Sequence, residues 1–492
     1  MRPAVALVAA MLLAVGSPAA RAADRPNVVW IVVDDMSADF GCYGSAAVPT
    51  PHVDRLAAEG TRFAHAFVTA PVCSPCRSAL ITGMYQTAIG AHHHRSGRGT
   101  EKIRLPAGVQ PVPAMFHEAG WYTCIGDGLS EPPATPRGRR QGLGKTDYNF
   151  EWDPVIYDGE DWADRKPGQP FFMQVQLPGG KLRDGKGGLE RARAQAEAAF
   201  GKATDPATVT LPPYLPRDPV LLADRAAYLD AVRLTDAHVG RVIARLEAEG
   251  ILDETLVIFV TDHGISHVRA KQFLYDEGTH VPFVVRGPGI PRGQVREDLV
   301  EHIDMPAISL AAAGLPIPPM MQGRDVFAKD YAAREAVFAA RDRCDETVDR
   351  IRSVRTPEWL YIRNFHPGRP MLQPNAYKDS KPTLVALRQL EAAGSLDPAT
   401  ERLLFAPTRP PEELYRWRED RWQLENLAAD PAQATTLADL RGRLDRWMAA
   451  MGDRGPESEA MYESDMKVYV GEGRPEVEAN IATMKRWAAE GK

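Results

Sequence analysis

Acidic side chains directly follow two of the apolar segments in this 492-residue sequence. Asp34 and Asp35 follow the run 27–33 (NVVWIVV), and Asp262, with His263 beside it, follows a second run, LVIFVT. Both runs are predicted to be buried strands of a parallel sheet, which binds ligands beyond the carboxyl ends of its strands. Acids gathered there repel one another unless a cation lies between them, and carboxylate oxygens favour Ca²⁺ or Mg²⁺. Taken singly, Asp34 and Asp262 are equally explained as caps of a turn and of a helix.

The segment 73–83, CSPCRSALITG, contains a second set of chemically active side chains. Ser74 and Pro75 are predicted to open a helix, since proline is accepted in a first helical turn. The free N–H groups and the dipole of that helix would then face an anion. Arg77 follows Cys73 by four residues and is expected one turn further along the helix.

This segment resembles the signature of the type I, formylglycine-dependent sulfatases of the alkaline phosphatase-like superfamily, which is Cys-x-Pro-x-Arg followed by Leu-x-Thr-Gly. The first five positions alone would be weak evidence, but the extended match is specific. The resemblance covers most of the chain and is strongest to secreted bacterial sulfatases. Further segments similar to family blocks are 50–56 (TPHVDRL), 275–282 (YDEGTHVP), 302–306 (HIDMP), 323–324 (GR) and 424–427 (LENL).

The resemblance implies two cofactors. One is formylglycine (3-oxoalanine), made from Cys73 by a formylglycine-generating maturation enzyme that acts on the motif. The other is Ca²⁺, with Asp34, Asp35, Asp262, His263 and the modified Cys73 as its ligands. The hydrate of an aldehyde has two hydroxyls on one carbon, so one can attack sulfur and the other can later expel sulfate. Calcium would lower the pKa of the attacking hydroxyl and neutralise the sulfate oxygens.

Three basic residues are expected to act beside Cys73. Arg77 would hold the hydrated aldehyde. Lys271 lies nine residues after Asp262, the register in which the family places a lysine or arginine that contacts sulfate. Lys145 lies in GKTD, which resembles the family's Gly-Lys-x-His segment. An isolated lysine is more often a solvated side chain, so these two roles depend on the resemblance.

Two histidines of the family pattern are missing from this chain. Asp147 occupies the position of a histidine that usually donates a proton to the leaving group, and the segment 176–181 (QLPGGK) contains no substrate histidine. Lys181 is expected to take over part of the anion binding. The candidates for the leaving-group acid are His267, His263 and a histidine of the run 92–94.

The run 92–94 consists of three histidines and is followed by an arginine. Three consecutive histidines cannot all point to one ion, and zinc sites use spaced ligands. Two interpretations are open, a pocket wall in which His93 and His94 contact substrate, or a plain surface loop. Arg369 is a further substrate-binding candidate, because 363–369 resembles a family segment that often overhangs the pocket.

Strands and helices alternate up to residue 340, which predicts an α/β fold with a mostly parallel sheet and helices on both faces. The resemblance makes this the alkaline phosphatase-like sandwich. The expected strands are 27–33, 121–125, 170–177, 256–261 and 281–286, and the expected helices include 53–59, 112–119, 189–200 and 223–249. The expected domains are a catalytic domain at 23–340, a smaller α+β unit at 341–460 and a polar helical tail at 461–492.

The first 22 residues are predicted to be a signal peptide. A positive start precedes an apolar run at 4–15 and a small-x-small cleavage site at 20–22. No later run reaches the ~18–20 apolar residues of a membrane span. The expected location is therefore the periplasm or the extracellular space. The net charge of −6 argues against nucleic acid as a partner, and an anionic substrate would need a local positive site.

Three functions remain open from the sequence. The first is hydrolysis of sulfate esters, with a sulfated carbohydrate as the expected substrate. The second is hydrolysis of phosphonate monoesters or phosphodiesters by a relative with the same modified cysteine. The third is non-catalytic binding of sulfated glycans with Cys73 unmodified.

Overall fold

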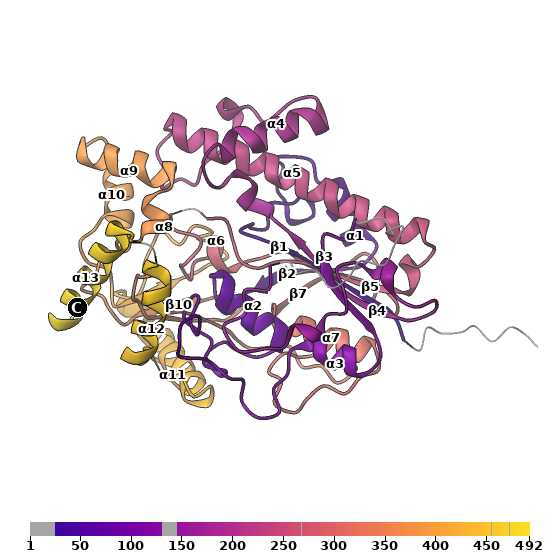
Figure 1. The fold of residues 1–492 in the computed structure, drawn as a ribbon. Coiled ribbons are helices and arrows are strands. Elements are labelled where there is room, and N and C mark those ends of the chain that lie inside the picture. The colour runs from indigo at the N-terminus through magenta and orange to yellow at the C-terminus, as the bar shows by residue number, and fades with distance from the viewer. Residues whose placement is uncertain (1–24, 130–144, 267, 454, 472) are drawn as a thin grey trace, which may run out of the picture.

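A mixed seven-stranded sheet forms the centre of the protein in the computed structural model, which describes residues 25–129, 145–266, 268–453, 455–471 and 473–492 (Figure 1). The predicted signal peptide lies outside these residues. The strand order is β3-β4-β1-β5-β6-β2-β7. The strands are β1 (Asn27–Val33), β2 (Thr61–Phe67), β3 (Tyr122–Gly126), β4 (Phe171–Leu177), β5 (Thr255–Thr261), β6 (Phe283–Arg286) and β7 (Gln294–Glu301).

Four neighbouring strands, β3, β4, β1 and β5, are parallel. Val33, the last residue of β1, pairs with Leu177 at the end of β4 and with Thr261 at the end of β5. The three strands therefore end level, and the residues that follow them leave the sheet at one edge. β6 runs antiparallel to both β5 and β2, so the sheet is mostly rather than wholly parallel.

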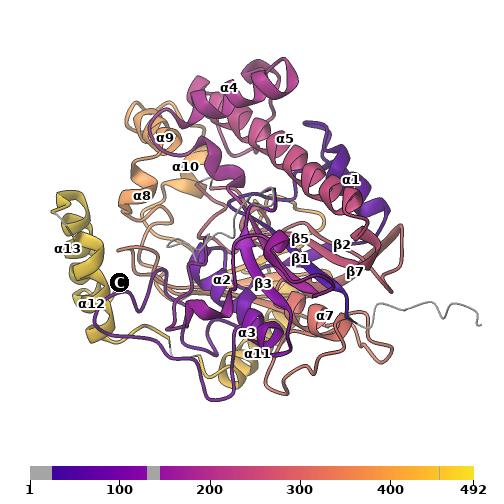
Figure 2. The same ribbon diagram turned by 45° about the vertical axis from the view of Figure 1, so that its right-hand side comes forward.

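Helices cover both faces of this sheet, as predicted (Figures 1 and 2). Every residue of β1 is buried, and alternate side chains enter two different cores. Ile31 packs in the core that includes Val242 of α5, whereas Trp30 packs in the core that includes Leu80 of α2. The helices of the first face are α1 (Pro51–Ala58) and α5 (Pro219–Ala248), with α4 (Gly188–Phe200) packed on the outer side of α5. Those of the second face are α2 (Cys73–Thr82), α3 (Val112–Glu118) and α7 (Asp304–Ala312).

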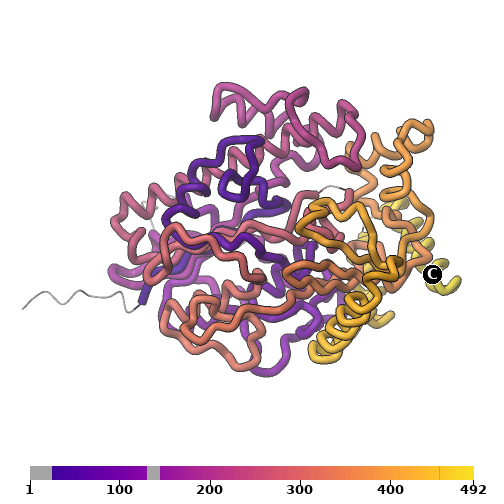
Figure 3. The backbone as a smooth tube through the Cα atoms, turned by 180° about the vertical axis from the view of Figure 1, so that it is seen from behind, coloured from indigo at the N-terminus to yellow at the C-terminus, as the bar shows by residue number. Residues whose placement is uncertain are grey.

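A second, antiparallel sheet has the order β11-β10-β9-β8. It consists of β8 (Val337–Arg341), β9 (Ile351–Arg355), β10 (Leu360–Asn364) and β11 (Glu412–Tyr415). The C-terminal part of the chain gathers at one end of the molecule (Figure 3). Its helices are α8 (Ala376–Asp379), α9 (Pro382–Ala392), α10 (Pro398–Leu404), α11 (Ala434–Ala450), α12 (Glu459–Val470) and α13 (Pro475–Ala489).

The domain boundary expected at residue 340 falls inside β8. Ala340 of this strand donates a backbone hydrogen bond of 2.9 Å to Thr69, which follows β2. The two sheets are thus connected next to the segment that leads into α2. None of the described helices is long and apolar enough to cross a bilayer.

Candidate active site

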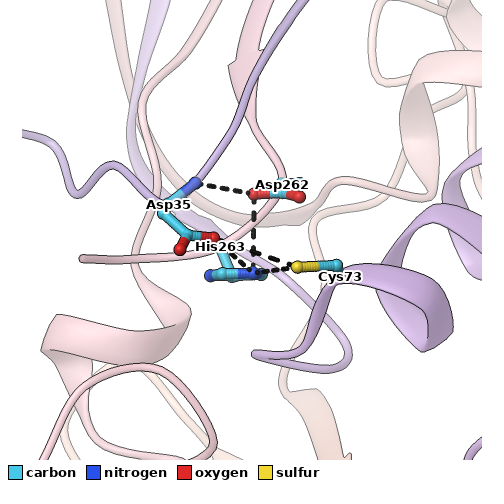
Figure 4. A group of neighbouring side chains, drawn as sticks. All are labelled: Asp35, Cys73, Asp262 and His263. Atoms are coloured by element: carbon cyan, nitrogen blue, oxygen red, sulfur yellow. Dashed lines mark hydrogen bonds and ion pairs between the residues drawn. The ribbon is translucent and has the colours of Figure 1, made fainter. Parts of the chain in front are cut away.

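Side chains from three separate elements meet beyond the carboxyl ends of β1 and β5 (Figure 4). Asp35 follows β1, Asp262 and His263 follow β5, and Cys73 is the first residue of α2. One ligand atom from each of these four buried residues lies within 4.8 Å of the others. The Cys73 sulfur lies 3.2 Å from His263 Nε2 and 3.9 Å from Asp35 Oδ1. The acids predicted from the two strand ends therefore share one site with the cysteine of the signature.

Helix α2 holds this arrangement because it is buried along its whole length. It begins at Cys73, one residue earlier than predicted, and ends before Gly83, whose φ of 66° suits glycine. Cys76 donates from its thiol to the carbonyl of Asp262 at 2.6 Å. The second cysteine of the signature thus fixes α2 against the end of β5. All five cysteines are free of disulfide bonds.

Arg77 faces the acids from one turn along α2. Its Nε donates to Asp262 Oδ2 at 3.2 Å, and its Nη2 forms a buried ion pair with Asp34. Its Nη1 reaches the side chain of Gln176 at the end of β4. These contacts indicate that Arg77 fixes the carboxylates, and its predicted hold on the hydrated aldehyde stays a prediction.

Three predicted lysines surround the same centre. The Lys271 ammonium lies 2.9 and 3.0 Å from the Asp35 oxygens and 3.4 Å from the Cys73 sulfur. The Lys181 ammonium lies 3.2 Å from Asp34 Oδ2 and 3.5 Å from the same sulfur. Lys145 contacts both Asp34 oxygens, at 2.8 and 2.9 Å. The local positive site that an anionic substrate requires is therefore present beside Cys73.

The lysines determine the electrostatics of the cysteine. Burial alone would raise the pKa of the Cys73 thiol, but the charges of Lys145, Lys271 and Lys181 hold that pKa well below its usual value. Burial, together with the neighbouring Asp34 carboxylate, raises the pKa of Asp262 to about 6. The site therefore stabilises the negatively charged form of the group at position 73. It destabilises the ionised form of Asp262.

The acids fit a hard cation. Asp34, Asp35 and Asp262 are at most 4% exposed and present carboxylate oxygens, the donors that Ca²⁺ prefers. Ammonium groups lie against both oxygens of Asp34 and of Asp35, so these carboxylates are already paired with positive charge. His263 contacts the Gly264 carbonyl through Nδ1, so its Nε2 faces the acids and the cysteine. Of the predicted ligands, His263 fits calcium least well, because calcium takes oxygen ligands.

His94 lies on another side of Cys73. One ligand atom each of His94, Cys73 and Asp147 lies within 4.8 Å of the others. His94 Nδ1 is 2.9 Å from an Asp345 oxygen. Burial would lower the pKa of His94, but the Asp345 carboxylate raises it to about 10. The ring is therefore charged at neutral pH and positioned next to the cysteine.

Sequence reasoning missed Asp345 and Tyr377. Asp345 is 251 residues from His94 along the chain, so spacing gives no signal for the pair. The Tyr377 ring centroid lies 5.2 Å from the Lys271 ammonium, and its hydroxyl donates to Asp184 at 3.1 Å. Both residues come from the part of the chain beyond residue 340, for which Arg369 was the predicted site residue.

Other predicted substrate contacts lie elsewhere or outside the described residues. Arg369 is buried and donates to the carbonyls of Val348 and of Lys492, the last residue. None of its hydrogen bonds joins it to the side chains around Cys73 in the described parts of the chain. His93 lies in a different cluster with His92, and its substrate contact stays a prediction. His267 lies outside the described residues.

The mixed sheet, with its site at the strand ends, places the protein in the alkaline phosphatase-like class of α/β folds. The family model described as Sulfatase matches residues 26–315, more than half of the chain. The chain belongs to the sulfatase family, and it is a sulfuric ester hydrolase.

Two relatives match over most of this chain. An ulvan-active sulfatase of Formosa agariphila is 31% identical, covering 89% of this chain and 77% of the relative. The human N-sulphoglucosamine sulphohydrolase is 27% identical, and the match covers 89% of this chain and 92% of the relative.

Solved structures share the fold at lower identity. A structure solved in complex with its substrate D-glucosamine-2-N,6-O-disulfate has a TM-score of 0.58 and 16% identity, covering 88% of this chain and all of the other. A phosphonate monoester hydrolase from Silicibacter pomeroyi has a TM-score of 0.57 and 18% identity, covering 87% and 96%. These two likenesses show the fold alone.

Proposed function

We propose that this protein hydrolyses sulfate esters of a carbohydrate, using formylglycine made from Cys73 and a bound calcium ion. One observation supports the proposal most directly. The Cys73 sulfur lies at the start of a buried helix, between acids from two strands and the ammonium groups of Lys271 and Lys181, at 3.4 and 3.5 Å. A cysteine used only for packing would not need a buried lysine and a second, partly exposed lysine beside its sulfur.

Each residue of the site has a separate role in the proposed reaction. When bound, the formylglycine hydrate would supply one hydroxyl to attack sulfur and a second to release sulfate, while Ca²⁺ would polarise the attacking group. Asp34, Asp35 and Asp262 would hold the ion, with His263 beside them. Arg77 fixes two of these carboxylates through its ion pairs.

Lys271 and Lys181 bind the sulfate oxygens in this proposal. Their ammonium groups flank the sulfur of Cys73, which marks the position of the reacting hydroxyls. Charge that develops on the sulfate in the transition state would thus meet two fixed cations in a site largely shielded from water, where such contacts are strongest. The Lys145 ammonium contacts Asp34, and in this proposal it stabilises the leaving oxygen of the ester.

His94 is the best-placed acid for the leaving group. Asp345 fixes its ring and keeps it protonated, as a proton donor near neutral pH requires. His263 is already committed to the acids and Cys73, and Asp147 is a carboxylate whose pKa is lowered, so it would not donate a proton. Burial alone would raise the pKa of Asp147, but the nearby positive charges, that of His94 first, lower it.

The entrance supports a sulfated carbohydrate as substrate. Arg95 is exposed beside His94, and its backbone N–H donates to the Ser74 hydroxyl next to Cys73. Burial would lower the pKa of its guanidinium, but the carboxylates of Asp345 and Asp147 raise it, so acids lie near this side chain. An exposed arginine close to Cys73 suits a substrate with a second anionic group, and the relatives named above act on ulvan and on N-sulphoglucosamine.

Maturation and export complete the proposal. Cys73 is 4% exposed in the folded chain, so a maturation enzyme would have to act on the 73–77 motif before α2 folds. The predicted signal peptide would then direct the protein to the periplasm or the exterior.

Turnover by the purified, matured protein tests the proposal. We expect hydrolysis of an aryl sulfate and of sulfated sugars, with a much lower kcat/KM for an aryl phosphodiester or phosphonate monoester. Cys73→Ser should lose activity, because serine has no second hydroxyl through which to release sulfate. A preference for the phosphodiester would support the phosphonate hydrolase instead, and binding of sulfated glycans without turnover would support the non-catalytic binder.

A further inference from the structure

A second group of potential metal ligands includes the two histidines that precede His94 in the chain. It consists of His92 and His93, from the loop after α2, and Asp342, the first residue after β8. The three side chains are 6%, 4% and 2% exposed, and one ligand atom from each lies within 4.8 Å of the others. The two imidazole rings lie 4.2 Å apart, centroid to centroid.

Several polar atoms of this cluster form no hydrogen bond in the described parts of the chain, although His93 Nδ1 lies 3.9 Å from a Glu457 oxygen. His92 Nδ1, both nitrogens of His93 and Asp342 Oδ2 are buried and form no hydrogen bond within the described residues. Native proteins satisfy nearly all buried polar groups, with protein atoms, water or an ion. Four such atoms in one place therefore indicate that a partner belongs there.

The neighbours of the cluster orient its atoms as metal ligands. His92 Nε2 contacts the carbonyl of Gly455 at 3.0 Å, so Nε2 bears the proton and the Nδ1 lone pair faces the cluster. The other Asp342 oxygen accepts from Arg352 at 3.0 Å. Hydrogen bonds of this kind fix the ligands of metal sites from outside.

The positive charges near this cluster are paired with acids, so a bound cation is compatible with the charges around it. Two arginines lie near the cluster: Arg343 follows Asp342 in the chain, and Arg352 donates to an Asp342 oxygen. The two arginines are themselves paired with acids. Arg343 pairs with Glu457 and Asp465, and Arg352 with Asp453 as well as Asp342.

We propose that His92, His93 and Asp342 bind a divalent transition-metal ion, with zinc as the best match, separate from the calcium site. Two imidazoles and one carboxylate with an open position are a zinc donor set, whereas calcium requires oxygen. His94 points away to Asp345, so the three consecutive histidines do not all share the ion. His92 and His93 are adjacent, unlike the spaced ligands of most zinc sites, but the third ligand, Asp342, comes from a distant part of the chain.

The ion would fix the wall of the active site. Arg343, next to Asp342, donates to the carbonyls of His94 and Asp345 at 3.0 and 2.8 Å. Joining His92 and His93 to Asp342 therefore holds the loop and the end of β8 together, where they position the His94–Asp345 pair. The role is structural, and it does not depend on the chemistry proposed for Cys73.

Metal analysis of the full chain tests this proposal. The calcium-saturated protein is equilibrated with Zn²⁺, desalted and measured by mass spectrometry of the elements. We expect one tightly bound zinc ion per chain in the wild type, loss of that ion in His93→Gln/Asp342→Asn, and retention in His52→Gln, which changes an exposed histidine of α1. Equal zinc contents in the wild type and the double variant would overturn the proposal.

A second measurement needs no variant. With Co²⁺ in place of zinc, the wild type should show the visible absorption of a four-coordinate cobalt centre, and added Zn²⁺ should abolish it. Absence of that absorption at saturating Co²⁺ would overturn the proposal even if the double variant failed to fold.

Discussion

At the scale of single residues, the site depends on positive charge placed against a buried sulfur. The ammonium group of Lys271 contacts both that sulfur and Asp35, and the ammonium group of Lys181 contacts both that sulfur and Asp34. A substrate sulfate would enter a position whose charge is already balanced by fixed groups. Preorganisation of this kind is usually the largest single contribution to catalysis.

Replacing Lys271 tests that idea. Lys271→Ala should lower kcat by about 10²–10³, the range found when one preorganised donor to a developing anion is removed. Steady-state kinetics on an aryl sulfate measure the loss, and an unchanged thermal midpoint shows that the fold survives. Lys271→Arg, which keeps the charge, should lose less. A kcat within a few-fold of wild type in Lys271→Ala would contradict the role.

The His94–Asp345 pair gives a prediction about leaving groups and pH. His94→Gln should lower kcat by about 10²–10⁴ for a sugar sulfate, whose leaving oxygen needs a proton, and far less for an aryl sulfate. Asp345 raises the pKa of His94 to about 10, so Asp345→Asn should lower that pKa and move the alkaline limb of the kcat/KM profile to lower pH. Equal losses for both substrates, with an unmoved limb, would exclude His94 as the acid.

At the scale of elements, burial decided what could be predicted. β1 was predicted at 27–33 and lies at those residues, because its strand is buried on both faces and therefore uniformly apolar. β2 (TRFAHAF) and β7 (QVREDLVE) were missed, since charged residues interrupt their apolar pattern near one edge of the sheet. The signature segment placed α2 correctly to within one residue.

Glu301, the buried last residue of β7, gives a pH prediction for stability. Burial, together with the Asp304 carboxylate, raises the pKa of Glu301 to about 7 against the charge of Arg334. The folded state thus binds this proton more tightly than the unfolded chain. Its contribution to stability is complete below pH ~4.5 and is lost as the pH rises through about 7.

Glu301→Gln removes this titration while keeping the shape of the side chain. Denaturant unfolding between pH 4.5 and 8 should show a smaller fall in the free energy of unfolding for the variant than for the wild type. Parallel pH dependences in the two proteins would show that Glu301 does not titrate in this range.

At the scale of the whole molecule, the site joins the two sheets. Sequence patterns predicted the acids, Cys73 and the lysines, because the family motif and the strand ends label them. They could not predict Asp345, which reaches His94 only after the second sheet packs against the first. Nor could they show that Arg369 lies against the C-terminal residue. Contacts of long sequence separation leave no local pattern.

Calcium should stabilise the molecule as a whole. An ion held by Asp34, Asp35 and Asp262 links β1 to β5, so a chelator should abolish activity and lower the thermal midpoint, and added Ca²⁺ should restore both. Binding to the folded state alone contributes about 2.7 kcal/mol when the free ion is at 100 times its Kd. In Asp262→Ala the midpoint should respond little to calcium. If a chelator left both the activity and the thermal midpoint of the wild type unchanged, that result would contradict calcium as the cofactor.

The mass of the peptide that contains residue 73, measured on active protein, shows whether Cys73 has been converted to formylglycine. The account predicts the mass in which the CH₂SH group of Cys73 has become an aldehyde, in a fraction that rises in proportion to specific activity across preparations. Protein produced without a maturation enzyme should retain the thiol and be inactive. Full activity in a preparation whose Cys73 is an unmodified thiol would contradict the account.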